Sequence, residues 1–288
     1  MMNKKQIGCT AVFVLLISLM LAACGNARSG QGAVSSLSGT ASENAVSAQS
    51  PGTEDASITG IIGAMDEEVQ SLEEHLTDKV IVNIAGMEFC TGTFSGHEVV
   101  VVKCNIGKVN AGICAQLLIE DFHVDRIINT GVAGSLDAKI DIGDIVISKD
   151  AVQHDYDLTP LGMKPGEFMD FGVTAFPADA ARQESALKAV SEVAPEIHAF
   201  VGRVCSGDQF IASKAQKQKI LDNFGGLCCE MEGGAIAQVC YVNKTPFVII
   251  RAISDKADDS EEISYETFKK SAAARCAAIT EYMVSHLE

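Results

Sequence analysis

Short apolar runs that end in a carboxylate occur three times in this chain, and they restrict its fold more than any other feature of the sequence. One run leads into Glu230 and Glu232, which two glycines and an Ala-Ile-Ala segment follow, and the others lead into Glu68 and Asp255. Each pattern is typical of a strand end that turns into a helix N-terminus or a loop. In an open α/β sheet such ends converge on one crevice. We therefore expect three carboxylates there, and proton chemistry on a polyhydroxylated substrate.

Two details qualify this expectation. Glu230 and Glu232 alternate, so in extended backbone only one of them can face a given side. An acidic first helical turn, which the helix dipole favours, would explain any one of these runs by itself.

The remaining pattern predicts an α/β fold. Helical periodicity and β-rich runs alternate through most of the chain, which favours a largely parallel central sheet. Strands are expected at 58–63, 80–84, 87–94, 98–104, 126–129, 145–148, 201–205 and 248–253, and helices at 65–76, 105–120, 180–193, 213–223 and 264–287. Residues 130–135 are predicted to form a glycine-bearing turn, and residues 154–176 a long loop of the kind that often covers a site.

The N-terminus has the features of an export signal. Lys4 and Lys5 precede an apolar stretch that is short for a membrane span, and Leu-Ala-Ala-Cys follows. We predict a lipoprotein signal peptide over 1–23, an acylated Cys24 and a flexible tether over 24–57, which place residues 58–288 outside the cell membrane. An ordinary cleaved signal or an uncleaved anchor is the alternative.

Charge and cysteine content restrict the possible partners. The net charge of −16 and the absence of Trp argue against nucleic acid as a partner. Eight cysteines follow Cys24, mostly inside apolar patterns, which favours buried free thiols over disulfides. Their spacing matches no zinc motif.

Seven motifs in order carry a resemblance to a known family. They read GIIGAMDEEV, IGKVNAG, IINTGVAG, GDIVIS, SGDQFI, EMEGGAIA and RAISDKAD. Together they resemble the 5′-methylthioadenosine/S-adenosylhomocysteine nucleosidases of the purine nucleoside phosphorylase superfamily, over essentially all of 58–288. The resemblance implies a three-layer α/β/α sandwich around a mixed, largely parallel sheet. It also implies a homodimer, no metal or organic cofactor, and hydrolysis of the N-glycosidic bond of adenine nucleoside thioethers.

The resemblance also implies roles for single residues. Asp255, held by Ser254, would protonate adenine N7, and Glu68 would take a proton from the attacking water. Glu232 would accept hydrogen bonds from the ribose hydroxyls and stabilise the cationic transition state, with Met231 packed on the sugar.

Other matched positions would shape the pocket. Phe210 would stack on adenine, the backbone of Ile211 would bind its edge, and Ala133 and Gly134 would let the backbone approach the purine. The sugar and the 5′ group would be lined by Met65, Ile106 and Tyr265, and the neighbouring subunit would cover the 5′ group with Leu161 and Met163.

Some features leave alternatives open. Val132, Gly234 and Ser135 depart from the common family pattern, and Val132 puts fine substrate preference in doubt. A purine nucleoside phosphorylase would share the fold, but it needs cations for phosphate, and the turn at 63–68 is acidic. A non-catalytic lipid-anchored nucleoside-binding protein would share the export signal.

Overall fold

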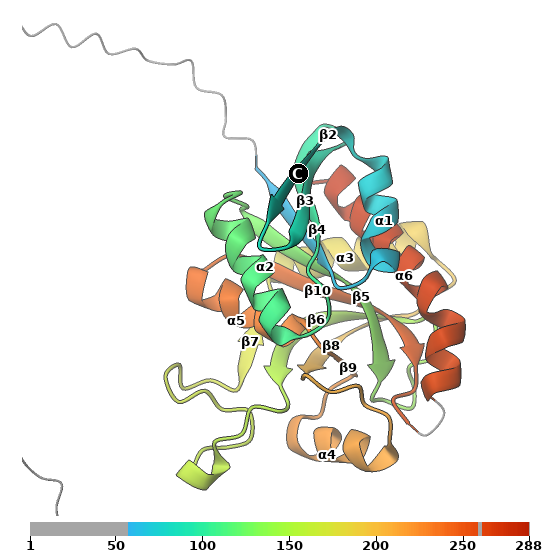
Figure 1. Ribbon diagram of the computed structural model, residues 1–288. Helices are drawn as coiled ribbons and strands as arrows, with labels where there is room; N and C mark the ends of the chain where they lie inside the picture. The colour runs from blue at the N-terminus through green and yellow to red at the C-terminus, as the bar shows by residue number, and fades with distance from the viewer. Residues whose placement is uncertain (1–56, 259–260, 288) are drawn as a thin grey trace, which may run out of the picture. The chain divides into compact units, whose positions relative to one another are not determined.

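The computed structural model describes residues 57–258 and 261–287 (Figure 1). The predicted signal peptide, Cys24 and the tether up to residue 56 lie outside the described residues. The helices are α1 (Asp66–His75), α2 (Lys108–Glu120), α3 (Ala180–Val193), α4 (Lys214–Phe224), α5 (Gly233–Asn243), α6 (Glu261–Ser285) and the short 3-10 helix η1 (Thr159–Leu161). The strands are β1 (Thr59–Gly63), β2 (Thr77–Ile84), β3 (Met87–Phe94), β4 (His97–Lys103), β5 (Arg126–Ser135), β6 (Ile145–Gln153), β7 (Ala175–Pro177), β8 (Ala199–Ser206), β9 (Cys228–Glu230) and β10 (Phe247–Asp255).

All strands described belong to one mixed sheet. β1 pairs in parallel with β4 and β5, and β10 pairs in parallel with β5. β10 also pairs with β6, which continues through β8 and β9 back to β5. Five strands therefore close into a ring, and β1, β4, β3 and β2 extend it outward. Antiparallel pairings are as frequent as parallel ones among the described strands, because the meander and the closure of the ring add antiparallel contacts.

Helices cover both faces of the sheet, which gives the expected three layers (Figure 1). Neighbouring residues of β5 show the division: Ile127 packs in the cluster that contains the buried faces of α2 and α5. Ile128 packs in the cluster that contains those of α1, α3 and α6. Successive side chains of a strand point to opposite faces, so β5 serves two apolar layers.

Most predicted elements are confirmed, including the β2–β4 meander and α3. Ser213 caps α4 as expected, since its hydroxyl accepts the Gln216 amide at 3.3 Å. The long loop between β6 and α3 contains η1 and ends in β7.

The predicted turn at 130–135 is wrong. β5 continues through it to Ser135, because β10 pairs beside residues 131–134 and β9 pairs with Gly134 and Ser135. The glycines that suggest a turn instead leave space for neighbouring side chains. A Cβ on Gly131 would lie 2.5 Å from Glu68 Oε1. β6 likewise extends five residues beyond the predicted strand, to Gln153.

The eight cysteines described are free and buried, which confirms the expectation of thiols that pack as small apolar residues. In the part of the chain that the structure describes, no helix has the length and hydropathy needed to cross a membrane.

Candidate active site

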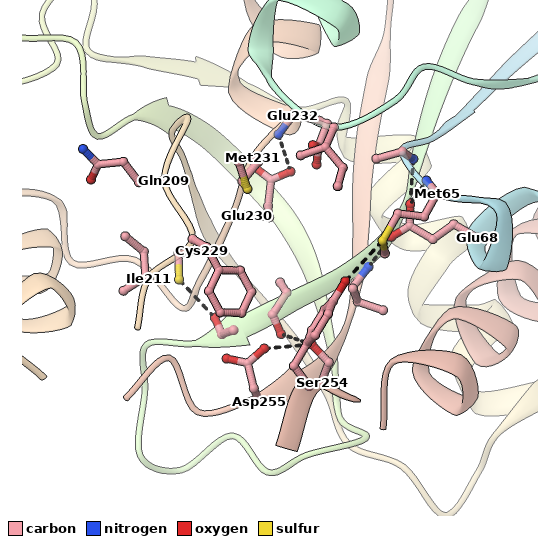
Figure 2. Close-up of a pocket in the computed structure, with 17 residues that line it drawn as sticks. Met65, Glu68, Gln209, Ile211, Cys229, Glu230, Met231, Glu232, Ser254 and Asp255 are labelled. Atoms are coloured by element: carbon pink, nitrogen blue, oxygen red, sulfur yellow. Dashed lines mark hydrogen bonds between the residues drawn. The ribbon is translucent and has the colours of Figure 1, made fainter. Parts of the chain in front are cut away.

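One pocket collects the carboxyl ends of β1, β5, β9 and β10, the N-terminus of α1, the loop after β8 and one residue of α6 (Figure 2). All twelve residues predicted to form the site line it: Met65, Glu68, Ile106, Ala133, Gly134, Phe210, Ile211, Met231, Glu232, Ser254, Asp255 and Tyr265. The converging strand ends inferred from the three apolar runs therefore meet as expected. Ala64, Val132, Gln209, Cys229 and Glu230 also line the pocket.

Glu68 is held in place by backbone donors from two strand ends. It occupies the third position of α1, and its Oε2 accepts the amides of Ala64 at 2.6 Å and Met65 at 3.0 Å. This is the glutamate half of a capping box. Oε1 accepts the Val132 amide from β5 at 3.0 Å. The side chain is 4% exposed, and burial raises the pKa of its carboxyl above the ordinary value, although Arg251 and the three amides oppose the shift.

Asp255 ends β10 and lines the same pocket (Figure 2). The Ser254 hydroxyl donates to its Oδ2 at 2.9 Å, as the sequence predicts, and the Ala257 amide donates to Oδ1 at 2.8 Å. A Cβ on Gly134 would lie 2.7 Å from Oδ1, so only glycine allows β5 to approach this carboxyl group.

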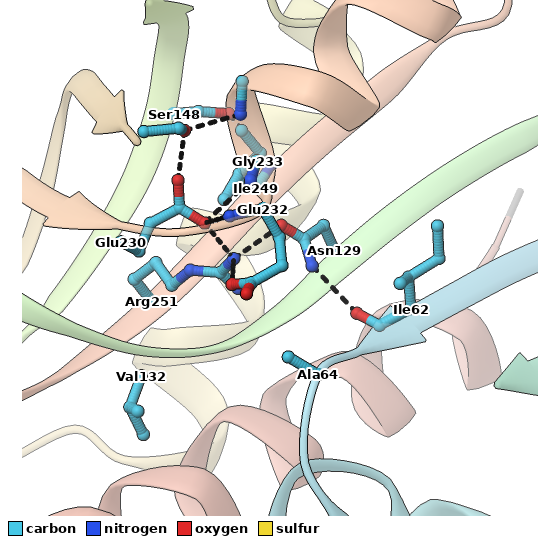
Figure 3. Close-up of polar contacts among 12 residues, drawn as sticks. Ile62, Ala64, Asn129, Val132, Ser148, Glu230, Glu232, Gly233, Ile249 and Arg251 are labelled. Carbon is cyan, nitrogen blue, oxygen red and sulfur yellow. Dashed lines mark hydrogen bonds and ion pairs between the residues drawn. The ribbon is translucent and has the colours of Figure 1, made fainter. Parts of the chain in front are cut away.

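Glu230 and Glu232 face different surroundings, as their alternation predicts. Glu230 is buried, pairs with Arg251 and accepts the amides of Glu232 and Gly233 at 3.1 and 2.8 Å (Figure 3). Arg251 Nη2 also donates to Asn129 Oδ1 at 2.7 Å and lies 3.8 Å from Glu232 Oε2.

The two glutamates therefore differ in acidity. Burial opposes ionisation of Glu230, but Arg251 and the Ser206 hydroxyl hold its pKa below the ordinary value. Burial and the neighbouring Glu230 charge raise the pKa of Glu232, although Arg251 and the Gly107 amide oppose the shift. Both glutamates line the pocket, but the carboxylate of Glu230 is the ion-pair partner of Arg251.

Sequence reasoning assigned no role to Glu230 or Arg251. The arginine inside an otherwise apolar strand was the available signal, because a buried guanidinium requires a carboxylate partner. The sequence does not show which acid supplies it, since Glu230 and Arg251 meet only through the ring of strands.

Apolar side chains form the rest of the wall. Phe210 and Tyr265 lie edge to face with ring centroids 5.5 Å apart, and the Tyr265 hydroxyl donates to Met65 Sδ at 3.2 Å. Ile106 and Phe210 are 52% and 49% exposed, so this side of the pocket is open in the single chain.

Comparisons with known proteins identify the family. The sequence profile of the Phosphorylase superfamily matches residues 58–285. The 5′-methylthioadenosine/S-adenosylhomocysteine nucleosidase of Staphylococcus aureus (strain bovine RF122 / ET3-1) is 43% identical over 229 residues, which cover 79% of this chain and 99% of that protein.

The chain belongs to the 5′-methylthioadenosine/S-adenosylhomocysteine nucleosidase family of the phosphorylase superfamily.

Solved structures agree with this assignment. The nucleosidase of Neisseria meningitidis in complex with methylthio-immucillin-A matches with a TM-score of 0.77 and 35% identity, over 80% of this chain and 99% of that one. Futalosine hydrolase of Helicobacter pylori matches with a TM-score of 0.77 and 31% identity, over 81% and 99% of the two chains. The fold of this chain is therefore similar both to a nucleosidase and to a futalosine hydrolase.

The position of each predicted nucleosidase residue is now known, but its role stays a prediction. Glu68, Asp255 and Glu232 each present a carboxyl group to the pocket of a family member. Within the described residues, no group of three or more His, Cys, Asp or Glu side chains is arranged to hold a metal ion.

Proposed function

We propose that this protein hydrolyses the N-glycosidic bond of 5′-methylthioadenosine and S-adenosylhomocysteine to give adenine and the corresponding 5-thioribose. The observation that carries the proposal is the meeting of Glu68, Asp255 and Glu232 in one pocket of a chain from the nucleosidase family. Glu68 lies in the first turn of α1, Glu232 is the N-cap of α5 and Asp255 ends β10.

Two of the carboxyl groups move protons. Glu68 Oε1 and Oε2 are fixed by three backbone amides, so the carboxylate is oriented before water arrives. Glu68 takes one proton from water as the water oxygen bonds to C1′ and the C1′–N9 bond breaks. Asp255 gives a proton to adenine N7, so the base leaves as neutral adenine.

The third carboxylate acts by charge. Positive charge builds on the ribose as the bond breaks, and a carboxylate in a site of low dielectric stabilises it strongly. Glu232 is 6% exposed and keeps Oε2 directed toward Arg251 at 3.8 Å, while Oε1 accepts the Gly107 amide. Its carboxylate also accepts hydrogen bonds from the ribose hydroxyls.

Water, and not phosphate, is the nucleophile. Among the described residues that line the pocket, four are carboxylates and none is lysine or arginine. Arg251 is buried behind the wall, where Glu230 neutralises it. A phosphate dianion would meet Glu68 and Glu232 without a cation to bind it, which disfavours the phosphorylase alternative.

The direct test is adenine release from each nucleoside in phosphate-free buffer, with Glu68→Gln as the matched control. We expect adenine and free thioribose in equal amounts from the wild-type protein and a strongly reduced rate from the variant. Binding of the nucleosides without adenine release would overturn the proposal in favour of a binding protein. The ratio of the two kcat/KM values gives the substrate preference, which Val132 at the pocket wall helps to set.

We propose that two copies of the chain form a homodimer through the outer surface of α2 and α5. Val109 and Ile113 on α2 are 72% and 44% exposed, and Tyr241 and Val242 on α5 are 40% and 55% exposed. Val109 lies shortly after Ile106 in the chain, and Ile106 lines the open side of the pocket. A second copy seated there would supply Leu161 and Met163 to cover the 5′ group, and the 67% exposure of Leu161 supports this.

We propose that the protein is anchored to the outer side of the cell membrane through acylated Cys24. The support is the sequence alone, in which Leu-Ala-Ala-Cys follows the apolar stretch and a Ser/Gly-rich segment follows the cysteine. Intact-mass measurement of the membrane fraction should show a lipid on Cys24, and Cys24→Ala should release the protein. An unmodified Cys24 in a freely soluble mature protein would contradict this proposal.

A further inference from the structure

A charged cluster lies next to Glu232 but outside the pocket wall. It joins the start of α2, the turn after β6 and the turn after β8 through three residues, Lys108, Asp155 and Asp208. Lys108 Nζ donates to Asp155 Oδ1 at 2.5 Å, and Asp155 Oδ2 accepts the Asp208 amide at 2.8 Å. Asp208 Oδ1 in turn accepts the Lys108 amide at 2.8 Å. The three residues therefore close a ring of hydrogen bonds, in which Asp155 uses both carboxyl oxygens.

The ring fixes the residue that contacts Glu232. Gly107 immediately precedes Lys108, and its amide donates to Glu232 Oε1 at 2.9 Å. Gly107 has φ +103°, and a Cβ there would lie 3.2 Å from Asp208 Oδ1. Its amide direction thus depends on a backbone conformation that favours glycine and on the adjacent Lys108–Asp208 bond. Because Gly107 is also the N-cap of α2, the positive end of the helix dipole faces the Glu232 carboxylate.

The cluster is sheltered enough to act as a rigid support. The side chains of Lys108 and Asp155 are 17% and 18% exposed, so solvent weakens their attraction less than that of a surface pair. Lys108 Nζ also donates to Gln153 Oε1 at 3.2 Å. Gln153 Nε2 donates to the Gly234 carbonyl at 3.2 Å, which connects the cluster to the first turn of α5, just after Glu232.

Asp155 is held in its ionised form by its partners in the cluster. Burial opposes its ionisation, but Lys108 and the Asp208 amide hold its pKa below the ordinary value. The adjacent imidazole of His154 has a pKa lowered by burial, so it adds no positive charge near neutral pH.

We propose that Asp155 is a positioning residue for this nucleosidase: through Lys108 and Asp208 it holds the Gly107 amide on Glu232 and so keeps the Glu232 carboxylate directed at the ribose. The inference rests on the proposed function, in which Glu232 binds the ribose. Neither Asp155 nor Lys108 lines the pocket, so their effect on the reaction passes through Gly107 and Glu232.

A double-mutant cycle between Asp155→Asn and Glu232→Gln tests this coupling. Asparagine keeps the shape of aspartate but has one acceptor oxygen, so it cannot hold Lys108 and Asp208 together. We expect Asp155→Asn to lower kcat/KM roughly tenfold in the wild-type background, the scale of one charged hydrogen bond. In the Glu232→Gln background the same change should cost less than about twofold. Equal losses in both backgrounds would overturn the inference, since a general structural effect adds independently of Glu232.

Asp157→Asn is the matched control. Asp157 lies in the same loop, and its carboxylate accepts the Thr159 amide at 2.8 Å without joining the cluster. It should leave kcat/KM unchanged. Lys108→Met removes the ammonium group that donates to Asp155. It should reproduce both the tenfold loss of kcat/KM and the dependence of that loss on Glu232.

Amide hydrogen exchange gives a second readout that does not need activity. In Asp155→Asn the peptide containing Gly107 should exchange faster than in the wild-type protein, and in Asp157→Asn it should not. Unchanged exchange in Asp155→Asn would overturn the inference. A wild-type protein that releases no adenine would overturn the proposed function instead, so the two failures are distinguishable.

Discussion

Three of the four carboxyl groups that line the pocket, those given roles in the reaction, have different environments. Glu68 accepts three backbone amides, Asp255 is bound by a serine hydroxyl and one amide, and Glu232 lies between Glu230, Arg251 and Gly107. Different surroundings allow chemically similar groups to act as base, acid and charge stabiliser.

The first prediction separates these roles. Glu68→Gln and Asp255→Asn should each lower kcat by roughly 10²-fold or more, the usual scale for one acid–base group. Their double mutant should lose less than the product of the two effects, because the reaction needs both groups in one step. Steady-state kinetics with methylthioadenosine measures this, and near-normal turnover in Glu68→Gln would contradict the assignment.

Glu232→Gln should behave differently. Its charge acts on the cationic transition state, so its loss should weaken binding of a cationic ribose mimic more than binding of substrate. Calorimetric affinities for the two ligands provide the comparison. Equal weakening of both would assign Glu232 to general ribose binding only.

The acid side of the pH profile gives another prediction. Glu68 and Glu232 must both be ionised, and burial raises the pKa of each above the ordinary 4.5, with Glu230 adding to the rise at Glu232 and Arg251 opposing both shifts. Below these pKa values the groups are protonated and inactive. Because the higher of the two pKa values sets the limb and burial raises that of Glu232 to about 8, we expect kcat/KM to fall with decreasing pH in a limb that lies well above 4.5, measured with a stability control at each pH. A limb at or below 4.5 would show that neither burial effect operates.

For single residues, the sequence predicted which side chains line the pocket, because its motifs match a known family. It did not predict the Arg251–Glu230 pair. An arginine in an apolar strand indicates that a partner exists, but the identity of the partner depends on which strands become neighbours.

Among the elements, β5 has the largest effect on the site. It carries Gly131, Val132, Ala133 and Gly134 past both Glu68 and Asp255, with β10 along its length and β9 at its end. The sequence TGVAGS is rich in residues typical of turns, so local propensity favours the wrong structure here. The segment is nevertheless a strand, because it pairs with β10 and β9. Its glycines allow the backbone of β5 to lie close to the side chains of Glu68 and Asp255.

This role of β5 predicts the effect of Gly131→Ala. The new Cβ would lie 2.5 Å from Glu68 Oε1 and 2.8 Å from Arg251 Nη1, so both side chains must move. Displacing the base should lower kcat by roughly 10²-fold, and the overpacking should cost about 1–3 kcal/mol of folding free energy. Kinetics and denaturant unfolding measure the two effects.

Gly112→Ala on α2 is the matched control. The nearest atom to its new Cβ, Val239 Cγ2, lies at 4.0 Å, so the substitution fits. It should keep kcat and stabilise the protein by about 0.5–1 kcal/mol, as alanine does in a helix. If Gly131→Ala were equally harmless, the close approach of β5 to Glu68 would be wrong.

The sheet brings segments that are distant in sequence together at the pocket. The layer formed by α2 and α5 exposes apolar side chains. Alternating strands and helices were enough to predict the α/β class. The closed ring of β5, β10, β6, β8 and β9 was not predictable from that alternation, because β9 has only three residues and one of its two neighbours, β5, is distant in sequence.

The proposed dimer leads to a prediction at this scale. Val109→Asp places a charge on the surface that a second copy would cover, so it should convert a dimer to a monomer and lower activity. Val80→Asp, on the 57% exposed Val80 of β2, is the control and should leave the dimer intact. Light scattering coupled to size exclusion measures the mass, and a wild-type monomer at micromolar concentration would contradict the dimer.

The most direct test of the central claim follows the oxygen atom of the nucleophile. Methylthioadenosine is converted in ¹⁸O-labelled water with unlabelled phosphate present, and the sugar product is analysed by mass spectrometry before its C1 oxygen exchanges. If Glu68 activates water and Asp255 protonates adenine, free methylthioribose should carry one ¹⁸O and adenine should carry none. A sugar phosphate without the label would contradict the hydrolytic account.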